Sequence, residues 1–332
     1  MSRVKIEKDI IVEVRDLHKS FDEEHRLFSR KKNTLTAVDH VSLQIYRGET
    51  LGIVGESGSG KSTLGRLILR LLESTSGDVR FEGQSITDIP ERKLGQYRRK
   101  MQIVFQDPFS ALNPWMTVYE LVAEPIRHYG TVAELDLRKQ VIALLEKVGL
   151  SEADLHKHPH EFSGGQRQRI CIARALALQP AFIVCDEPVS ALDVSIQSQI
   201  LNLLHDLQEE LRLTYLFISH NLAVVRHVAD RVAVMYLGKL VEVGPVEAVF
   251  ANPSHPYTRS LLSAMLSIDP DVRRERIKLP GDIPNPMNKP SGCRFHTRCE
   301  FSTDLCMKLE PELLDRGNEH YVACHMKELV QH

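Results

Sequence analysis

Apolar and polar residues in the first third of the chain form short runs that predict strands. Ile11 to Val14, and the pair Leu43 and Ile45, follow a period of two, which is the pattern of a strand with one buried face. Leu51 to Val54 is apolar throughout, as in a strand covered on both faces. Further strand-like runs follow at Arg80 to Phe81 and at Met101 to Phe105. The charged insert from Asp22 to Asn33 is expected to form an exposed hairpin or loop.

The period changes to that of helices over residues 112–160. Leu137, Val141 and Leu144 recur at intervals of three to four positions, and Gly149 is a helix stop signal. This stretch therefore predicts a helical subdomain at about residues 112–160, inserted into a core of strands and helices.

Helices and strands alternate after this stretch. A helix is predicted from Gln166 to Leu178, and a buried strand from Phe182 to Cys185. Helix, strand and helix then follow at Ile196 to Leu211, Tyr215 to Ser219 and Leu222 to Val228. This order predicts an α/β domain over residues 10–250, with a largely parallel sheet covered on both faces.

The proline content of the sequence rises near Gly244. Eight prolines occur from Pro245 to Pro290, these two included. Proline removes a backbone donor and interrupts helices and strands. We therefore expect regular structure to be broken up in an extended C-terminal module at residues 251–332.

The run after Leu51 to Val54 fits the phosphate-binding pattern G-x-x-x-x-G-K-[ST]. Its glycines let backbone N–H groups surround phosphate oxygens, and the helix expected from Thr63 to Leu72 points its positive end at the same place. Lys61 is expected to reach the β and γ phosphates, and Ser62 to ligate Mg2+. A Gly/Ser turn before a helix is the structural alternative; the order strand, loop, helix favours nucleotide binding. The nucleotide-binding residues predicted here are Gly55, Glu56, Ser57, Gly58, Ser59, Gly60, Lys61, Ser62 and Thr63.

A second chemical signal is the pair of acids that ends the apolar run from Ala181. Asp186 is predicted to hold Mg2+ through water, and Glu187 to activate the attacking water as general base. Capping of the following turn is the alternative role of both acids.

Charge and hydropathy narrow the class of protein. The formal net charge is −2 and the acidic and basic residues are interspersed, so nucleic-acid binding is disfavoured. Apolar runs have the length of strands, well short of the roughly 18 residues of a membrane span, and the N-terminus lacks the apolar core of a secretory signal. The chain is expected in the cytoplasm, or on a membrane through partners.

The segment Phe162-Ser163-Gly164-Gly165-Gln166 resembles the signature sequence of ATP-binding-cassette (ABC) ATPases, with Phe where Leu is commoner. Ser163 and the glycine amides form an anion-binding cap on a helix N-terminus. The resemblance implies a P-loop NTPase core with an inserted α-helical subdomain, an antiparallel β subdomain and a C-terminal extension. It also implies a dimer in which each signature covers the ATP of the opposite subunit.

Other positions match the family in the same order along the chain. The resemblance assigns Gln106 to the contact with Mg2+, Ser190 to Asp193 to the loop after the catalytic acid, and His220 to the γ phosphate. Phe21 occupies the place of the aromatic that stacks on adenine, although Tyr is commoner there. Taken singly, His220 and Gln106 have ordinary structural explanations; their order makes the catalytic set Glu187, His220, Gln106 and Lys61.

The C-terminal module resembles the extension of the dipeptide/oligopeptide importer ATPases. The matching segments are Asn252 to Thr258, Gly281 to Pro286 and Pro290 to Phe295 with Arg298 and Cys299. This resemblance implies uptake of di- or oligopeptides or a related small solute. The implied partners are a paralogous ATPase (a heterodimer is favoured over a homodimer), two transmembrane permease subunits and a solute-binding protein. The implied location is the cytoplasmic face of the membrane, and the alternative function is a soluble ABC-type ATPase acting on ribosomes or DNA.

Four of the six cysteines crowd the C-terminal module, at Cys293, Cys299, Cys306 and Cys324. A cytosolic chain seldom uses disulfides, so metal binding is favoured, and the spacing lacks the close C-x2-C pairs of structural zinc. Four thiolates suit an iron–sulfur cluster, and resemblance to the importer ATPases supports [4Fe–4S]. Zn2+ and free or redox-labile thiols remain alternatives.

Overall fold

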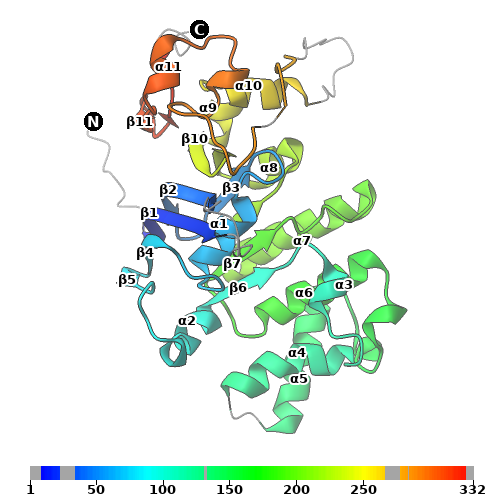
Figure 1. Ribbon diagram of the computed structural model, residues 1–332. Coiled ribbons are helices and arrows are strands. Elements are labelled where there is room, and N and C mark those ends of the chain that lie inside the picture. Colours follow the sequence, from blue (N-terminus) through cyan, green and yellow to red (C-terminus); the bar gives the residue numbers. More distant parts are fainter. Residues whose placement is uncertain (1–8, 23–33, 131–132, 266–276, 283, 327–332) are drawn as a thin grey trace, which may run out of the picture. The chain divides into compact units, whose positions relative to one another are not determined.

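The computed structural model describes residues 9–22, 34–130, 133–265, 277–282 and 284–326 (Figure 1). The charged insert predicted between Asp22 and Asn33 falls outside them apart from its first residue, Asp22. The chain divides into two compact units. One unit comprises residues 1–11, 45–49 and 88–217, and the other residues 12–44, 50–87 and 218–332.

The unit that contains residues 88–217 is built on parallel strands and helices. β6 (Met101–Val104), β7 (Phe182–Asp186) and β8 (Thr214–Ile218) lie in the order β8-β7-β6, and β6 pairs with β7 in parallel register. Its α-helices are α2 (Gly95–Lys100), α3 (Pro108–Ala111), α4 (Val118–Tyr129), α5 (Glu134–Lys147), α6 (Gly164–Leu176) and α7 (Val194–Leu211). Every residue of β7 is buried, as its continuous apolar sequence predicts.

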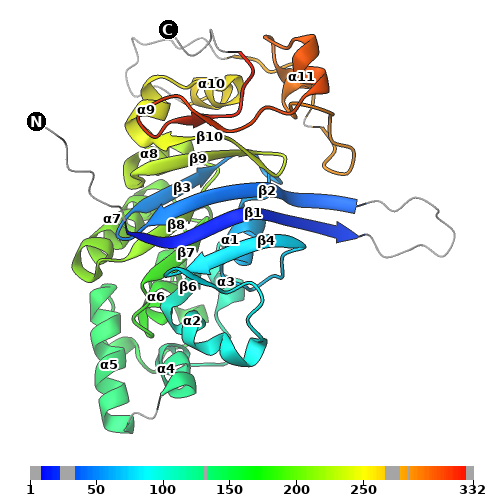
Figure 2. The same cartoon turned by 90° about the vertical axis from the view of Figure 1, so that its left-hand side faces the viewer.

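The helices predicted over residues 112–160 are α4 and α5, which lie side by side in both views (Figures 1 and 2). Thr117 caps α4: its hydroxyl accepts from the Glu120 N–H, while the Glu120 carboxylate accepts from the Thr117 N–H. Leu137, Val141 and Leu145 form the buried stripe of α5, in agreement with the period read from the sequence.

The other unit carries two β-layers. In the first, the strands lie in the order β2 (Thr34–Tyr46), β1 (Ile10–Asp22), β4 (Ser76–Phe81) and β5 (Gln84–Ser85) (Figure 1). β1 with β4 and β4 with β5 are antiparallel. In the second, the order is β11 (Leu314–Asp315), β12 (Tyr321–Val322), β10 (Lys239–Pro245), β9 (Arg231–Tyr236) and β3 (Thr50–Val54). β3 and β9 are parallel and the other pairs are antiparallel. These layers confirm the predicted α/β class with an antiparallel β portion.

Helix α1 (Lys61–Ile68) follows the loop after β3 and is shorter than predicted. The sequence places its end at Leu72, but Arg70 adopts a φ of 52°, a conformation that a helix does not continue through. Helix α8 (Leu222–Val228) has the predicted bounds.

Regular structure after Gly244 is broken into short pieces among the described residues, as the prolines predict, although the sequence did not predict which segments form helices. Helix α9 (Val246–Ala251) packs against β10, and α10 (Pro256–Ser263) and α11 (Asp304–Lys308) follow in the C-terminal module (Figures 1 and 2). Pro256 occupies the first turn of α10, where an N–H has no partner within the helix and a proline therefore costs nothing. Among the described residues, no helix is both long and apolar enough to cross a membrane.

Candidate functional site

The loop between β3 and α1 requires glycine at both of its ends, Gly55 and Gly60. Gly55 has a φ of 153° and Gly60 a φ of 103°. A Cβ on Gly55 would lie 2.1 Å from the carbonyl oxygen of Met235, and a Cβ on Gly60 would lie 2.1 Å from that of Ala37. Gly58 has a φ of 77° with open space around its Cβ position. The loop is therefore pressed against β9 and β2 at both ends and is open in its middle.

Lys61 lies inside this loop and is 5% exposed. Its ammonium donates to the carbonyl oxygens of Gly55 at 2.8 Å and Glu56 at 3.0 Å, so the charge is held in the curve of the backbone. Ser62 and Thr63 lie in the first turn of α1, whose N-terminus points its N–H groups toward the loop. A cation beside a ring of N–H donors is suited to binding the phosphates of a nucleotide.

Two further predicted nucleotide residues belong to the same unit. Phe21 lies near the end of β1, is 37% exposed, and has the Lys19 ammonium 5.0 Å from its ring centroid. His220 follows β8 and is exposed. Both side chains are accessible to a ligand.

The two predicted acids lie at the end of β7 in the other unit. Asp186 is 3% exposed. Glu187 has a φ of 49°, and its carboxylate Oε2 accepts a hydrogen bond of 2.9 Å from the Gln106 amide. Ser190 holds the Glu187 carbonyl through its N–H at 3.2 Å and its hydroxyl at 3.1 Å. A left-handed backbone at a residue that is not glycine costs about 1–2 kcal/mol and is concentrated at functional sites.

The predicted signature begins helix α6. The Ser163 hydroxyl accepts from the Gln166 N–H, and the Gln166 side chain accepts from the Ser163 N–H at 3.0 Å. Gly165 lies against α7, because a Cβ there would be 2.5 Å from Cγ2 of Ile196; a Cβ on Gly164 would be 3.3 Å from Leu192. Asp193 is the residue before the first turn of α7. The signature is therefore a capped helix start whose glycines permit close packing on α7.

Sequence reasoning assigned no role to two residues that contact the phosphate loop. The Glu56 N–H donates to the Tyr257 hydroxyl at 2.9 Å, and Arg298 forms an ion pair with the Glu56 carboxylate at 3.0 Å. Both lie in tail segments that resemble the importer extension. That resemblance is the only sequence feature that marks Tyr257 and Arg298. No residue pattern around them indicates a contact with the phosphate loop.

The four clustered cysteines are free thiols in the C-terminal module. Burial raises the pKa of Cys293 and of Cys299 to about 11 each, and the Cys293 N–H donates to the Cys306 carbonyl at 2.8 Å. Among the described residues, no three of these sulfur atoms lie within 4.8 Å of one another, although Zn–S bonds of about 2.3 Å would bring them closer than that. The structure thus does not support the predicted [4Fe–4S] cluster or the Zn2+ alternative.

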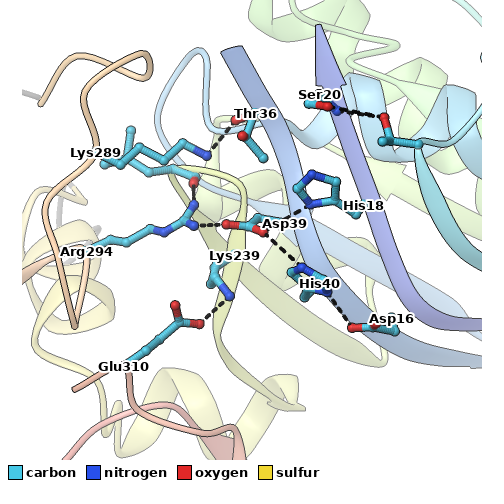
Figure 3. Close-up of polar contacts among 12 residues, drawn as sticks. Asp16, His18, Ser20, Thr36, Asp39, His40, Lys239, Lys289, Arg294 and Glu310 are labelled. Carbon is cyan, nitrogen blue, oxygen red and sulfur yellow. Dashed lines mark hydrogen bonds and ion pairs between the residues drawn. The ribbon is translucent and has the colours of Figure 1, made fainter. Parts of the chain in front are cut away.

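Within the described part of the chain, only His18, Asp39 and His40 bring three ligating atoms within 4.8 Å (Figure 3). His18 Nδ1 lies 3.1 Å and His40 Nε2 3.8 Å from Asp39 Oδ1. His40 also contacts Asp16 at 2.8 Å through Nδ1. The Arg294 guanidinium already pairs with the Asp39 carboxylate. A metal ion at this cluster would therefore be repelled by the guanidinium and would compete with it for Asp39.

Polar contacts around this cluster join the C-terminal module to β2 and β10. Besides Arg294, the module contributes Lys289, whose ammonium donates to the Thr36 carbonyl at 2.6 Å, and Glu310, which pairs with Lys239 of β10 (Figure 3). Burial lowers the pKa of Arg294 to about 10 and that of Lys289 to about 8. The buried cations are thus held by specific oxygens on the strands.

Comparison with known proteins agrees with these features. The ABC transporter family pattern matches residues 38–190, and the oligopeptide/dipeptide transporter C-terminal region matches residues 241–306. The chain is 50% identical to the oligopeptide transport ATP-binding protein AppF of Bacillus subtilis, covering 96% of this chain and 98% of that protein. It is 47% identical to OppF, the oligopeptide transport ATP-binding protein of Salmonella typhimurium, covering 98% of each.

A solved structure shows the same fold. The ATP-binding cassette MJ0796, in a dimer bound to ADP and Pi, aligns with a TM-score of 0.64 and 31% identity over 71% of this chain and 99% of that chain. The phosphate loop, the capped signature helix, the acids at the end of β7 and the C-terminal module thus follow one another along the chain in the expected order. The chain belongs to the ABC transporter ATPases, in the group that carries the oligopeptide/dipeptide transporter C-terminal region.

Proposed function

We propose that this chain is the ATP-hydrolysing subunit of an ABC importer that takes up di- or oligopeptides or a related small solute. The observation that carries the proposal is the combination of the ATPase motifs with the oligopeptide/dipeptide transporter region at 241–306 in one chain. Relatives named for oligopeptide transport match nearly its whole length. These names support an importer over a soluble ATPase acting on ribosomes or DNA.

In the proposed reaction, the segment of residues 55–63 binds the β and γ phosphates through Lys61 and through backbone N–H groups other than that of Glu56, which donates to Tyr257. Phe21 stacks on the adenine. Mg2+, held by Ser62, Gln106 and Asp186 through oxygen ligands or water, would neutralise phosphate charge.

Glu187 is the proposed general base. It takes a proton from the water that attacks the γ phosphorus, the bond from that phosphorus to the β–γ bridging oxygen breaks, and ADP and phosphate leave. The Gln106 amide orients the Glu187 carboxylate through the 2.9 Å hydrogen bond, and His220 contacts the γ phosphate.

The proposed catalytic unit is a dimer of ABC ATPases. The nucleotide of the opposite subunit would be covered by Ser163, Gly164, Gly165 and Gln166. Asp193 would contribute to the nucleotide site from the loop that follows Glu187 in its own subunit. A paralogous partner is favoured over a second copy.

The proposed domains are an ATPase domain at residues 10–250, with its helical subdomain at about 112–160, and a C-terminal extension at 251–332. We propose that the protein lies on the cytoplasmic face of the membrane. There it would bind two permease subunits, which a solute-binding protein supplies with solute.

We also propose, beyond these findings, that Cys293, Cys299, Cys306 and Cys324 bind a [4Fe–4S] cluster. Four thiols within one small module and the resemblance to importer ATPases support it. Protein purified without oxygen should be brown, with about four irons and four sulfides per chain, and Cys306→Ser should lose the colour. Colourless protein with stoichiometric zinc, or with neither metal, would reject the cluster.

Uptake by the assembled transporter tests the main proposal. The chain, its partner ATPase, the permeases and the binding protein are reconstituted in vesicles, and a labelled tripeptide is supplied on the side of the binding protein. We expect ATP-dependent accumulation that stops in the Glu187→Gln variant. ATP hydrolysis that ignores permeases and peptide but responds to ribosomes or DNA would contradict the importer.

A further inference from the structure

The C-terminal module holds the phosphate loop at Glu56. We infer that Arg298 and Tyr257 are positioning residues of the nucleotide site, which set the shape of the loop and with it the affinity for ATP. This inference rests on the proposed function, because it concerns the same ATP. It assigns to the module a direct part in nucleotide binding, in addition to any part in transport.

The guanidinium of Arg298 grips both oxygens of the Glu56 carboxylate. Nη1 lies 3.0 Å from Oε2 and Nη2 lies 3.4 Å from Oε1, which is the two-point geometry that arginine forms with carboxylates. The side chain of Arg298 is 8% exposed and that of Glu56 24%. This two-point geometry distinguishes the pair from ordinary exposed ion pairs, which contribute little.

Tyr257 holds the backbone of the same residue. Its hydroxyl accepts the Glu56 N–H at 2.9 Å, and the tyrosine is fully buried. Burial raises the pKa of Tyr257, so the hydroxyl stays neutral. Glu56 is thus fixed at two points, at its side chain by Arg298 and at its main chain by Tyr257.

A buried cluster of three aromatic rings, the aromatic base, supports these two contacts. Tyr257, Tyr236 and Phe295 pack with ring centroids 4.6 to 5.4 Å apart, and each is at most 1% exposed. Tyr236 ends β9, which pairs in parallel with β3, the strand that leads into the loop. The base therefore joins α10 and the turn before Arg298 to the strands that carry the loop.

The position of Glu56 also affects Lys61, because the two residues are hydrogen-bonded. Lys61 donates to the carbonyl oxygens of both Gly55 and Glu56. A Glu56 released by the module would shift the peptide groups that hold the Lys61 ammonium. Binding geometry that is pre-organised in this way favours ATP affinity, because the ordering cost is not paid on binding.

The test measures binding of a fluorescent ATP analogue, the KM and kcat of ATP hydrolysis, and thermal stability. Arg298→Ala and Tyr257→Phe are compared with Lys308→Ala, which removes an exposed cation from α11 of the same module. We expect the analogue Kd and the KM to rise about tenfold for Arg298→Ala and severalfold for Tyr257→Phe, with smaller changes in kcat and none for Lys308→Ala. Arg298→Lys should recover only part, because it keeps the charge without the fork.

The exchanged pair Glu56→Arg with Arg298→Glu should bind the analogue more tightly than either single variant, provided that the two side chains act through each other. Wild-type Kd and KM in both Arg298→Ala and Tyr257→Phe would overturn the inference. If Arg298→Ala does not fold, Tyr257→Phe decides alone, since it removes one oxygen and keeps the ring. Failure of the wild-type chain to bind the analogue would instead contradict the proposed function.

Discussion

The side-chain amide of Gln106 donates to the carboxylate of Glu187 across 2.9 Å. Gln106 follows β6 and Glu187 follows β7, two parallel neighbours in one unit. The two residues are 81 positions apart in the chain, and they meet because the carboxyl ends of parallel strands lie at one edge of a sheet. This contact ties the proposed metal-contacting glutamine to the proposed base.

Glu187→Gln should abolish turnover while leaving ATP binding intact. The new amide has the same shape and still offers an oxygen to Gln106, but it cannot take a proton. General bases contribute about 10²- to 10⁴-fold, so we expect a loss of kcat in that range with an unchanged Kd for ATP. Phosphate release assays and equilibrium binding measure the two quantities; wild-type kcat would reject the base assignment.

Lys61→Ala should weaken binding itself. Hydrogen bonds from a charged group contribute about 1.5–3 kcal/mol, which corresponds to a roughly 10- to 150-fold increase in the Kd for ATP. Lys93→Ala, in an exposed turn before α2, is the matched control and should bind normally. An equal Kd in the two variants would show that Lys61 does not contact the nucleotide.

Gly165→Ala should destabilise the protein for a steric reason. The added Cβ would lie 2.5 Å from Cγ2 of Ile196, and overpacking of this kind costs about 1–3 kcal/mol. Removing that methyl with Ile196→Ala should relieve the clash, so the double variant should be more stable than the sum of the two single effects. Denaturant unfolding measures all four proteins, and strict additivity would mean that the two residues do not touch.

His255 should make stability depend on pH. Burial lowers its pKa to about 4 from an ordinary 6.5, so it stays neutral in the folded chain while the unfolded chain takes up a proton. Its contribution is complete above pH 6.5 and is lost as the pH falls toward about 4, a total on the order of 3 kcal/mol. Thermal unfolding between these pH values should show a steep decline.

His255→Asn is the matched variant for that decline. The Nδ1 atom of His255 accepts the Tyr257 N–H at the start of α10, and asparagine caps helices in the same way without titrating. The variant should therefore remain folded and lose less stability on acidification. Equal slopes for the two proteins would assign the decline to other groups.

Much of the fold could be read from the sequence because its signals are local. The buried strand β7 and helix α8 follow from apolar runs and periodicity, and the phosphate loop follows from glycines that must take unusual φ angles. The end of α1 and the helices α9 and α10 were missed. Arg70 enters the left-handed region without a glycine to signal it, and Pro256 starts a helix where a proline more often breaks one.

The sequence by itself determined the chemistry of the chain: a phosphate loop, two acids, a signature and a C-terminal module of four cysteines, all encoded by neighbouring residues. The tertiary structure alone decided that Arg298 and Tyr257 hold Glu56. Arg298 is separated from Glu56 by 242 positions in the sequence and Tyr257 by 201. Such contacts depend on the pairing of β3 with β9 and of β10 with β12. No local period encodes that pairing, because it is set by which surfaces the whole chain buries together.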